Sequence, residues 1–149
     1  CATIANRGYY YVPHVVKAIQ GQPLDTLYTR RHYTMAKSWA YDKVVEGMRS
    51  AVERGTCRAA NNPQYAVCGK TGTAQNRGQD HSVFMGFAPM DKPKIAIAVY
   101  VETGGFGADF GVPIGALMME QYINGKLSEN SKKKAEDFHN RHIYYGSNH

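Results

Sequence analysis

The sequence contains no run of about 20 apolar residues, so no stretch of it is expected to cross a bilayer as a helix. It also shows no signal peptide at its start. Acidic residues are scarce, since 12 Asp and Glu stand against 18 Lys and Arg, a net charge of +6. Residues 61–125 nevertheless hold four basic and five acidic residues, and no expected helix or strand gathers basic side chains on one face. This pattern argues against nucleic acid as a partner.

Cysteine is scarcer still, with Cys1, Cys57 and Cys68 as the complete set. Cys57 and Cys68 could pair only if the chain folds back between them. We therefore expect small buried residues or free thiols rather than a disulfide. Cysteine usage does not indicate the compartment of the protein.

The chain is long enough for one ordinary domain or part of a larger one. Residues 2–7 have the pattern of the last turns of a helix, and Gly8 is the expected C-terminal cap. Because this helix-like segment follows Cys1 directly, we expect the chain to be cut from something longer. Residues 9–16 are aromatic and β-branched and predict a strand interrupted at Pro13.

The most informative stretch is the expected strand over residues 65–75. If it is extended, Thr71, Thr73 and Gln75 share one face, so two hydroxyl groups point the same way. Gly72 between them leaves the backbone open to close approach, and Lys70 adds a positive charge. This arrangement suits a ligand that carries a carboxylate and lies along the strand edge like an added strand.

The elements around this strand follow from apolar periodicity. Helical spacing predicts a helix from Ser38 to Gly55, and a second helix from Pro113 to Gly125. Residues 82–88 and 94–102 predict two strands joined by a hairpin loop. Both faces of the 94–102 strand are apolar, so we expect it to be central and covered on both sides, with the second helix packed on its alanine face.

The strand motif is part of a longer string that closely resembles the transpeptidase domain of class B penicillin-binding proteins. The nearest match is the elongation-type member, penicillin-binding protein 2. The strings that carry the resemblance are GKTGTAQN at 69–76, DHS at 80–82, FMGFAP at 84–89, ATIAN at 2–6, VVEGM at 44–48 and VETGGFG at 101–107. The match runs over roughly residues 1–124.

The resemblance implies an α+β fold in which helices pack on an antiparallel sheet. That fold is the C-terminal portion of a transpeptidase domain like those of penicillin-binding proteins and β-lactamases. Residues 1–125 form this part, and residues 126–149 are expected to be a polar basic tail in solvent. It also implies site roles. Lys70 supports proton transfer, the hydroxyls of Thr71 and Thr73 bind the substrate carboxylate beside Gly72, and the Thr73 N–H forms half of an oxyanion hole.

The implied activity is that of a serine-type D,D-transpeptidase, which needs no cofactor and no metal. Its partners would be the peptidoglycan stem peptide ending in D-Ala-D-Ala, β-lactams and the proteins of cell-wall elongation, with no nucleic acid. The parent protein would act at the periplasmic face of the inner membrane.

The chain departs from the family in the nucleophile. Ser131-x-x-Lys134 and Ser128-x-Asn130 satisfy the other two motifs in form, but they follow the strand motif in polar sequence, where no base activates a serine. We therefore expect a fragment that is inactive alone. Two alternatives stay open: a non-catalytic module that binds cell-wall peptide or a partner protein, and a fragment of a β-lactamase.

Other chemical patterns are expected to be structural. Adjacent side chains of Asp80, His81 and Ser82 diverge in an extended segment, so they predict a loop-positioning role rather than a hydrolytic triad. The glycine-rich segment Gly104–Gly107 predicts a flexible loop near the site. His139 and His142 lack the further ligands of a typical metal site.

Overall fold

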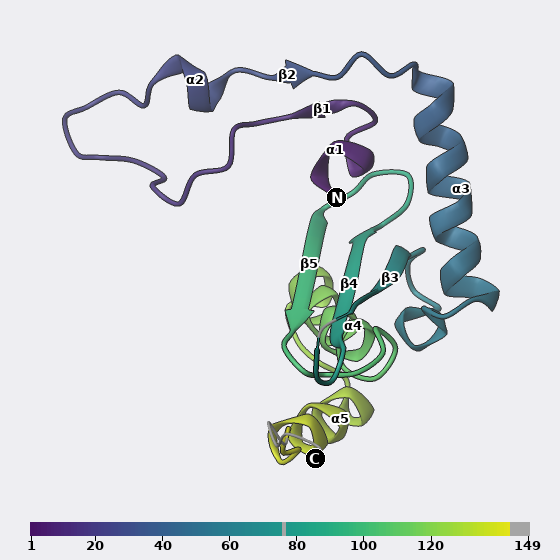
Figure 1. The fold of residues 1–149 in the computed structure, drawn as a ribbon. Helices are drawn as coiled ribbons and strands as arrows, with labels where there is room; N and C mark the ends of the chain where they lie inside the picture. Colours follow the sequence, from purple (N-terminus) through teal and green to yellow (C-terminus); the bar gives the residue numbers. More distant parts are fainter. Residues whose placement is uncertain (76, 144–149) are drawn as a thin grey trace.

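The computed structural model describes residues 1–75 and 77–143. The elements in chain order are α1 (Ala2–Ala5), β1 (Tyr9–Tyr10), α2 (Thr26–Thr29), β2 (His32–Tyr33), α3 (Ser38–Arg54), the 3-10 turn η1 (Arg58–Ala60), β3 (Cys68–Ala74), β4 (His81–Ala88), β5 (Ile95–Val101), α4 (Gly111–Asn124) and α5 (Glu129–His139). Figure 1 shows the main sheet flanked by α3 and α4. No helix of the described residues has the length and apolarity that crossing a membrane requires.

The main sheet has three strands within the described residues, in the order β3-β4-β5, and both pairings are antiparallel. Its central strand β4 fully buries Phe84, Phe87 and Ala88. Helices α3 and α4 pack on this sheet, so the predicted α+β fold is confirmed.

One core cluster lies between the sheet and α4, and the Phe84 ring is at its centre. A Cβ atom on Gly115 would lie 2.5 Å from that ring, and one on Gly69 would lie equally close. These glycines therefore make room for the aromatic ring, and α4 approaches the sheet at short distance. Val52 of α3 and Met119 of α4 complete the cluster without any exposed area.

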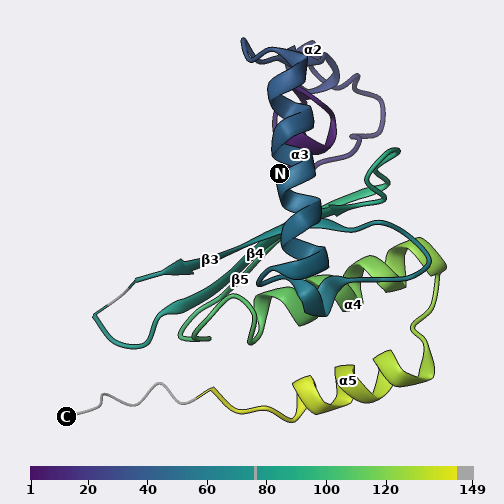
Figure 2. The ribbon, with the colours of Figure 1, turned by 90° about the vertical axis from the view of Figure 1, so that its right-hand side faces the viewer.

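A second core cluster lies on the opposite face of the sheet, where α1 and α3 meet it. Val45 and Met48 of α3 pack there against Cys68 and Phe87. The helix predicted over residues 38–55 thus has the apolar face that its periodicity indicated. Figure 2 shows that the N-terminal end of α3 extends away from the sheet.

Strand β5 differs from the prediction. It is the outer strand of the sheet, not a central one, and its Ala96, Ala98 and Tyr100 are exposed. Helix α4 packs against the face with Ile97 and Val99 instead of the alanine face. Branched side chains bury more apolar area than alanine does, so this choice of face is the more stabilising one.

The expected polar tail contains a helix within its described part, α5, which lies along α4 (Figure 2). Ser128 caps α5, because its side chain accepts a hydrogen bond from the Ser131 N–H. Glu120 of α4 accepts hydrogen bonds from the Ser128 N–H at 2.8 Å and from the Ser131 hydroxyl at 2.6 Å. Polar contacts therefore dock α5, which apolar periodicity could not predict.

Residues 9–37, here called the arm, extend away from the sheet (Figure 1). The strand predicted over 9–16 is reduced to Tyr9–Tyr10, which pairs with His32–Tyr33. Beyond Pro13 the arm carries exposed apolar side chains, and Val15 is 100% exposed.

Candidate functional site

The predicted motif lies on β3 at the edge of the main sheet. Lys70, Thr71, Gly72 and Thr73 all belong to the strand, as the sequence indicated. Their neighbours on β4 fix the register, and no strand in residues 1–75 or 77–143 pairs with the other edge of β3. The motif is therefore presented along a sheet edge that an extended ligand can approach.

The side chains of the motif divide between the two faces of the sheet. Thr71 pairs with Phe84 and Thr73 with Ser82, so both hydroxyls belong to the face on which α4 packs. Lys70 belongs to the opposite face and is exposed. Its Nζ donates a hydrogen bond of 2.8 Å to the carbonyl oxygen of Thr71, so the ammonium group turns back along the strand.

The Thr71 hydroxyl has a partner that the sequence analysis missed. The Oγ1 atoms of Thr71 and Thr56 lie 2.6 Å apart, within hydrogen-bond distance. Thr56 follows α3 and lies 15 residues upstream of Thr71. Only the Gly55 helix stop beside it marked this position in the sequence.

The loop between β5 and α4 passes directly against the motif strand, and a glycine of this loop, Gly107, makes the contact. A Cβ atom on Gly107 would lie 2.5 Å from the Val83 carbonyl oxygen, 2.8 Å from Thr71 Cβ and 2.9 Å from the Gly72 carbonyl oxygen. Two of these atoms belong to backbone that pairing holds in place, so only glycine fits here. The loop predicted to lie near the site is in contact with the motif strand itself.

Residues 80–82 anchor this loop, which confirms their predicted positioning role. The buried Ser82 hydroxyl donates to the Phe106 carbonyl oxygen at 2.7 Å and accepts from the Gly111 N–H at 3.0 Å. His81 Nδ1 accepts a 2.9 Å hydrogen bond from the Thr103 N–H. The Asp80 carbonyl oxygen accepts from the Gly105 N–H. These bonds engage the Ser82 hydroxyl with backbone and leave it no role as a nucleophile.

The described cysteines form no disulfide, and Cys57 and Cys68 are fully buried, as predicted for small buried thiols. Burial raises the pKa of the Cys68 thiol to about 11, and burial likewise raises the pKa of Cys57. Both groups are therefore neutral thiols near pH 7 and poor nucleophiles.

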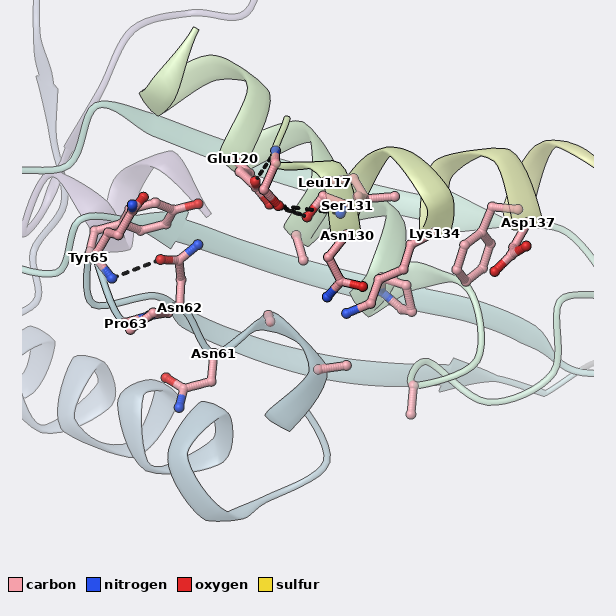
Figure 3. Close-up of a pocket in the computed structure, with 18 of the residues that line it drawn as sticks. Asn61, Asn62, Pro63, Tyr65, Leu117, Glu120, Asn130, Ser131, Lys134 and Asp137 are labelled. Carbon is pink, nitrogen blue, oxygen red and sulfur yellow. Dashed lines mark hydrogen bonds between the residues drawn. The ribbon is translucent and has the colours of Figure 1, made fainter. Parts of the chain in front are cut away.

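A pocket lies away from the motif, between α4, α5 and the segment 59–65 (Figure 3). Its volume is about 830 Å³, and none of Lys70, Thr71 or Thr73 lines it. It does contain the two formal motifs of the tail, since Ser128, Asn130, Ser131 and Lys134 line it. Ser131 and Lys134 therefore share a cavity, as the nucleophile and lysine of a Ser-x-x-Lys motif would.

The surroundings of Ser131 argue against that role. Its hydroxyl is engaged with the Glu120 carboxylate. Burial raises the pKa of Glu120, but hydrogen bonds from Ser131 and Ser128 outweigh burial, so the pKa lies below its ordinary value. A carboxylate with a lowered pKa is a weak base. The Ser128–Ser131–Glu120 group is therefore a docking contact between helices.

Metal-ligand candidates are not brought together in the described part of the chain. Within residues 1–75 and 77–143, no group of three or more His, Cys, Asp or Glu side chains has the arrangement of a metal site.

Comparison with known proteins agrees with this fold. Residues 1–120 match the family described as the penicillin binding protein transpeptidase domain. The peptidoglycan D,D-transpeptidase MrdA of Acinetobacter baumannii is 37% identical over 130 residues, which cover 71% of this chain and 19% of that protein. The chain belongs to the penicillin-binding protein transpeptidase family.

Solved structures narrow the class further. The crystal structure of Pseudomonas aeruginosa PBP2 in complex with WCK 5153 aligns with a TM-score of 0.69 and 37% identity, over 87% of this chain and 30% of that one. Mycobacterium tuberculosis penicillin-binding protein A, as a ceftriaxone acyl-enzyme complex, aligns with a TM-score of 0.68 and 29% identity, over 82% of this chain and 30% of that one. The chain is a PBP2-type transpeptidase region that spans about a fifth to a third of these relatives.

Proposed function

We propose that this chain is the C-terminal part of the transpeptidase domain of a peptidoglycan D,D-transpeptidase. The protein binds penicillin and cross-links cell-wall stem peptides by serine acyl transfer. The observation that carries the proposal is the placement of the motif, Lys70 to Thr73, along an edge of β3 with which no strand of the described residues pairs, in a chain of this family.

The reaction exchanges one amide bond for another. A serine oxygen attacks the penultimate D-Ala carbonyl carbon and loses its proton to a base, and the carbonyl oxygen becomes an oxyanion. The tetrahedral intermediate collapses, the terminal D-Ala leaves with a proton on its nitrogen, and an ester to serine remains. An amine of a neighbouring stem peptide then attacks that ester and releases the serine.

Each motif residue has a role in this scheme. Lys70 supports proton transfer and attracts the terminal carboxylate, while the hydroxyls of Thr71 and Thr73 donate hydrogen bonds to it. Hydrogen bonds to a charged group are short and strong. The Thr73 N–H forms half of the oxyanion hole, and one such fixed donor lowers the barrier by roughly 3 kcal/mol. Gly72 leaves room for the ligand backbone beside the strand.

We further propose that the chain is inactive alone, because the serine nucleophile lies in upstream sequence that this chain lacks. The Ser131 and Ser128 motifs of the tail are not substitutes, since Glu120 engages both residues. The partners follow from the family: stem peptides ending in D-Ala-D-Ala, β-lactams and cell-wall elongation proteins. The parent protein acts at the periplasmic face of the inner membrane, with an anchor outside this chain.

Intact mass after incubation with benzylpenicillin tests the proposal. We expect the longer protein with its upstream sequence to gain one penicillin mass and this chain alone to gain none. Lys70→Ala in the longer protein should slow acylation severely, whereas Ser131→Ala should leave it unchanged. Stoichiometric acylation of this chain alone would contradict the missing nucleophile, and the labelled residue would identify the true one.

The competing function is a non-catalytic module that binds cell-wall peptide or a partner protein. It predicts no acylation of either protein. The upstream reading frame separates the two functions as well, because only the enzyme requires an upstream Ser-x-x-Lys.

A further inference from the structure

We infer that Thr56 is a positioning residue that aims the Thr71 hydroxyl at the carboxylate of the ligand. The inference rests on the proposed function, since it concerns the carboxylate that Thr71 binds there. The observation is the 2.6 Å distance between the two Oγ1 atoms, which joins the motif strand to the end of α3.

The backbone around Thr56 is held firmly on both sides. The N–H groups of Gly55 and Cys57 both donate to the Ala51 carbonyl oxygen at 3.1 Å, so the chain turns sharply at the end of α3. A Cβ atom on Gly55 would lie 2.9 Å from the Ala51 backbone, so this turn requires glycine. Cys57 is fully buried in the core beneath α4. Thr56 thus faces Thr71 from a fixed position.

The count of protons gives the hydrogen bonds a direction. A hydroxyl group donates one hydrogen bond and accepts up to two, whereas a carboxylate only accepts. When Thr71 donates its single proton to a carboxylate, the short contact with Thr56 persists only if Thr56 donates to Thr71. In the ligand-bound state, Thr56 therefore donates to Thr71 and Thr71 donates to the carboxylate. The hydrogen bond from Thr56 polarises the O–H group of Thr71, which strengthens the hydrogen bond from Thr71 to the carboxylate.

The hydroxyl contact adds little to the stability of the fold itself. Thr56 is exposed and Thr71 is half-buried, so water can replace either partner. Pairing with β4 and the crossing at Gly107 already hold the motif strand in place. The loss of the Thr56 hydroxyl should therefore appear in recognition of the carboxylate and not in the melting temperature.

The test uses the full-length protein with Thr56→Val, Thr56→Ser, Thr71→Val and the double variant Thr56→Val/Thr71→Val. Valine keeps the shape of threonine and removes the hydroxyl, whereas serine keeps the hydroxyl. Acylation rate constants are measured by intact mass with benzylpenicillin and with its carboxamide, which lacks the negative charge. The ratio of the two rate constants reports carboxylate recognition.

We expect Thr56→Val to lower the rate constant with benzylpenicillin by about three- to tenfold, the effect of one net hydrogen bond, and to leave the carboxamide rate unchanged. Thr56→Ser should restore the wild-type ratio. In the Thr71→Val background, Thr56→Val should have no further effect, because it acts through Thr71.

Three results would overturn the inference. In one, the wild-type protein reacts faster with benzylpenicillin than with the carboxamide, and Thr56→Val leaves the ratio of the two rate constants unchanged. That result leaves the proposed function intact. Another is an additional loss in the double variant, which means that Thr56 contacts the ligand directly. The last is a wild-type protein that benzylpenicillin does not acylate, and that result removes the proposed function together with the inference. If Thr56→Val fails to fold, Thr56→Ala provides the same comparison.

Discussion

The sheet with α4 and the arm of residues 9–37 use similar apolar residues with opposite results. Around Phe84, side chains from β4, α3 and α4 enclose one another without exposed area. In the arm, Val15 and Ile19 are exposed, and the pairing of Tyr9–Tyr10 with His32–Tyr33 is a ladder of only two residue pairs. Apolar composition alone therefore does not determine whether a segment is buried. Burial also requires neighbouring helices or strands that pack against its apolar side chains.

The largest expected effect contrasts these two regions directly. Phe84→Ala should destabilise the protein by about 3–5 kcal/mol, because it leaves a cavity between close-packed glycine surfaces. Val15→Ala in the arm is the matched control and should change stability by less than about 0.5 kcal/mol. Urea denaturation of the full-length protein measures both values. Similar losses in the two variants would contradict the contrast.

A smaller effect is expected where the loop crosses behind the motif. Gly107→Ala should destabilise the protein by about 1–3 kcal/mol, the usual effect of overpacking, and should slow acylation by benzylpenicillin because it displaces the motif strand. Gly78→Ala is the control, since a Cβ atom at Gly78 meets nothing within 4 Å. Acylation rates and urea midpoints of the two variants decide the outcome; equal rates would show that the crossing does not fix the strand.

The smallest effect concerns α5, which is intermediate between the enclosed core and the exposed arm. Glu120→Gln should weaken its docking by about 1 kcal/mol, the net value of a hydrogen bond. Because the pKa of Glu120 is lowered on folding, its contribution is present above the ordinary pKa of 4.5 and is lost as the pH falls through the lower folded value. Hydrogen exchange of residues 129–139 from pH 7 to pH 3 checks both expectations.

A pH-independent exchange rate, after correction for intrinsic chemistry, would show that Glu120 does not dock α5. Lys132→Ala serves as a control, because its hydrogen bond to Glu129 is local to the exposed face of α5.

The sequence predicted the elements best where periodicity was strong. Helix α3, strands β4 and β5 and helix α4 all appear near their predicted bounds. The helices repeat apolar side chains at helical spacing, and the strands are short apolar segments bounded by loop residues. Periodicity did not predict which face of β5 is buried, because both faces are apolar in the sequence. Only the packing of α4 against Ile97 and Val99 distinguishes the two faces.

The site was predictable as a motif and not as a set of contacts. Lys70 to Thr73 were singled out by their place in an expected strand and by the resemblance to the transpeptidase family, and they do lie on β3. The hydroxyl of Thr56 and the crossing of Gly107 depend on how distant segments meet at the strand. Helix α5 was missed for the same reason, since the Glu120 carboxylate of α4 and the Phe110 ring hold it in place.

The consecutive order of β3, β4, β5 and α4 has a consequence for the folding pathway. Each strand pairs with its immediate neighbour in sequence through a short connection, so little loop-closure entropy opposes the pairing. Proteins rich in such local contacts fold rapidly. We therefore expect the motif strand to gain its β4 partner early, and the Thr56 hydroxyl to reach Thr71 only when the end of α3 docks.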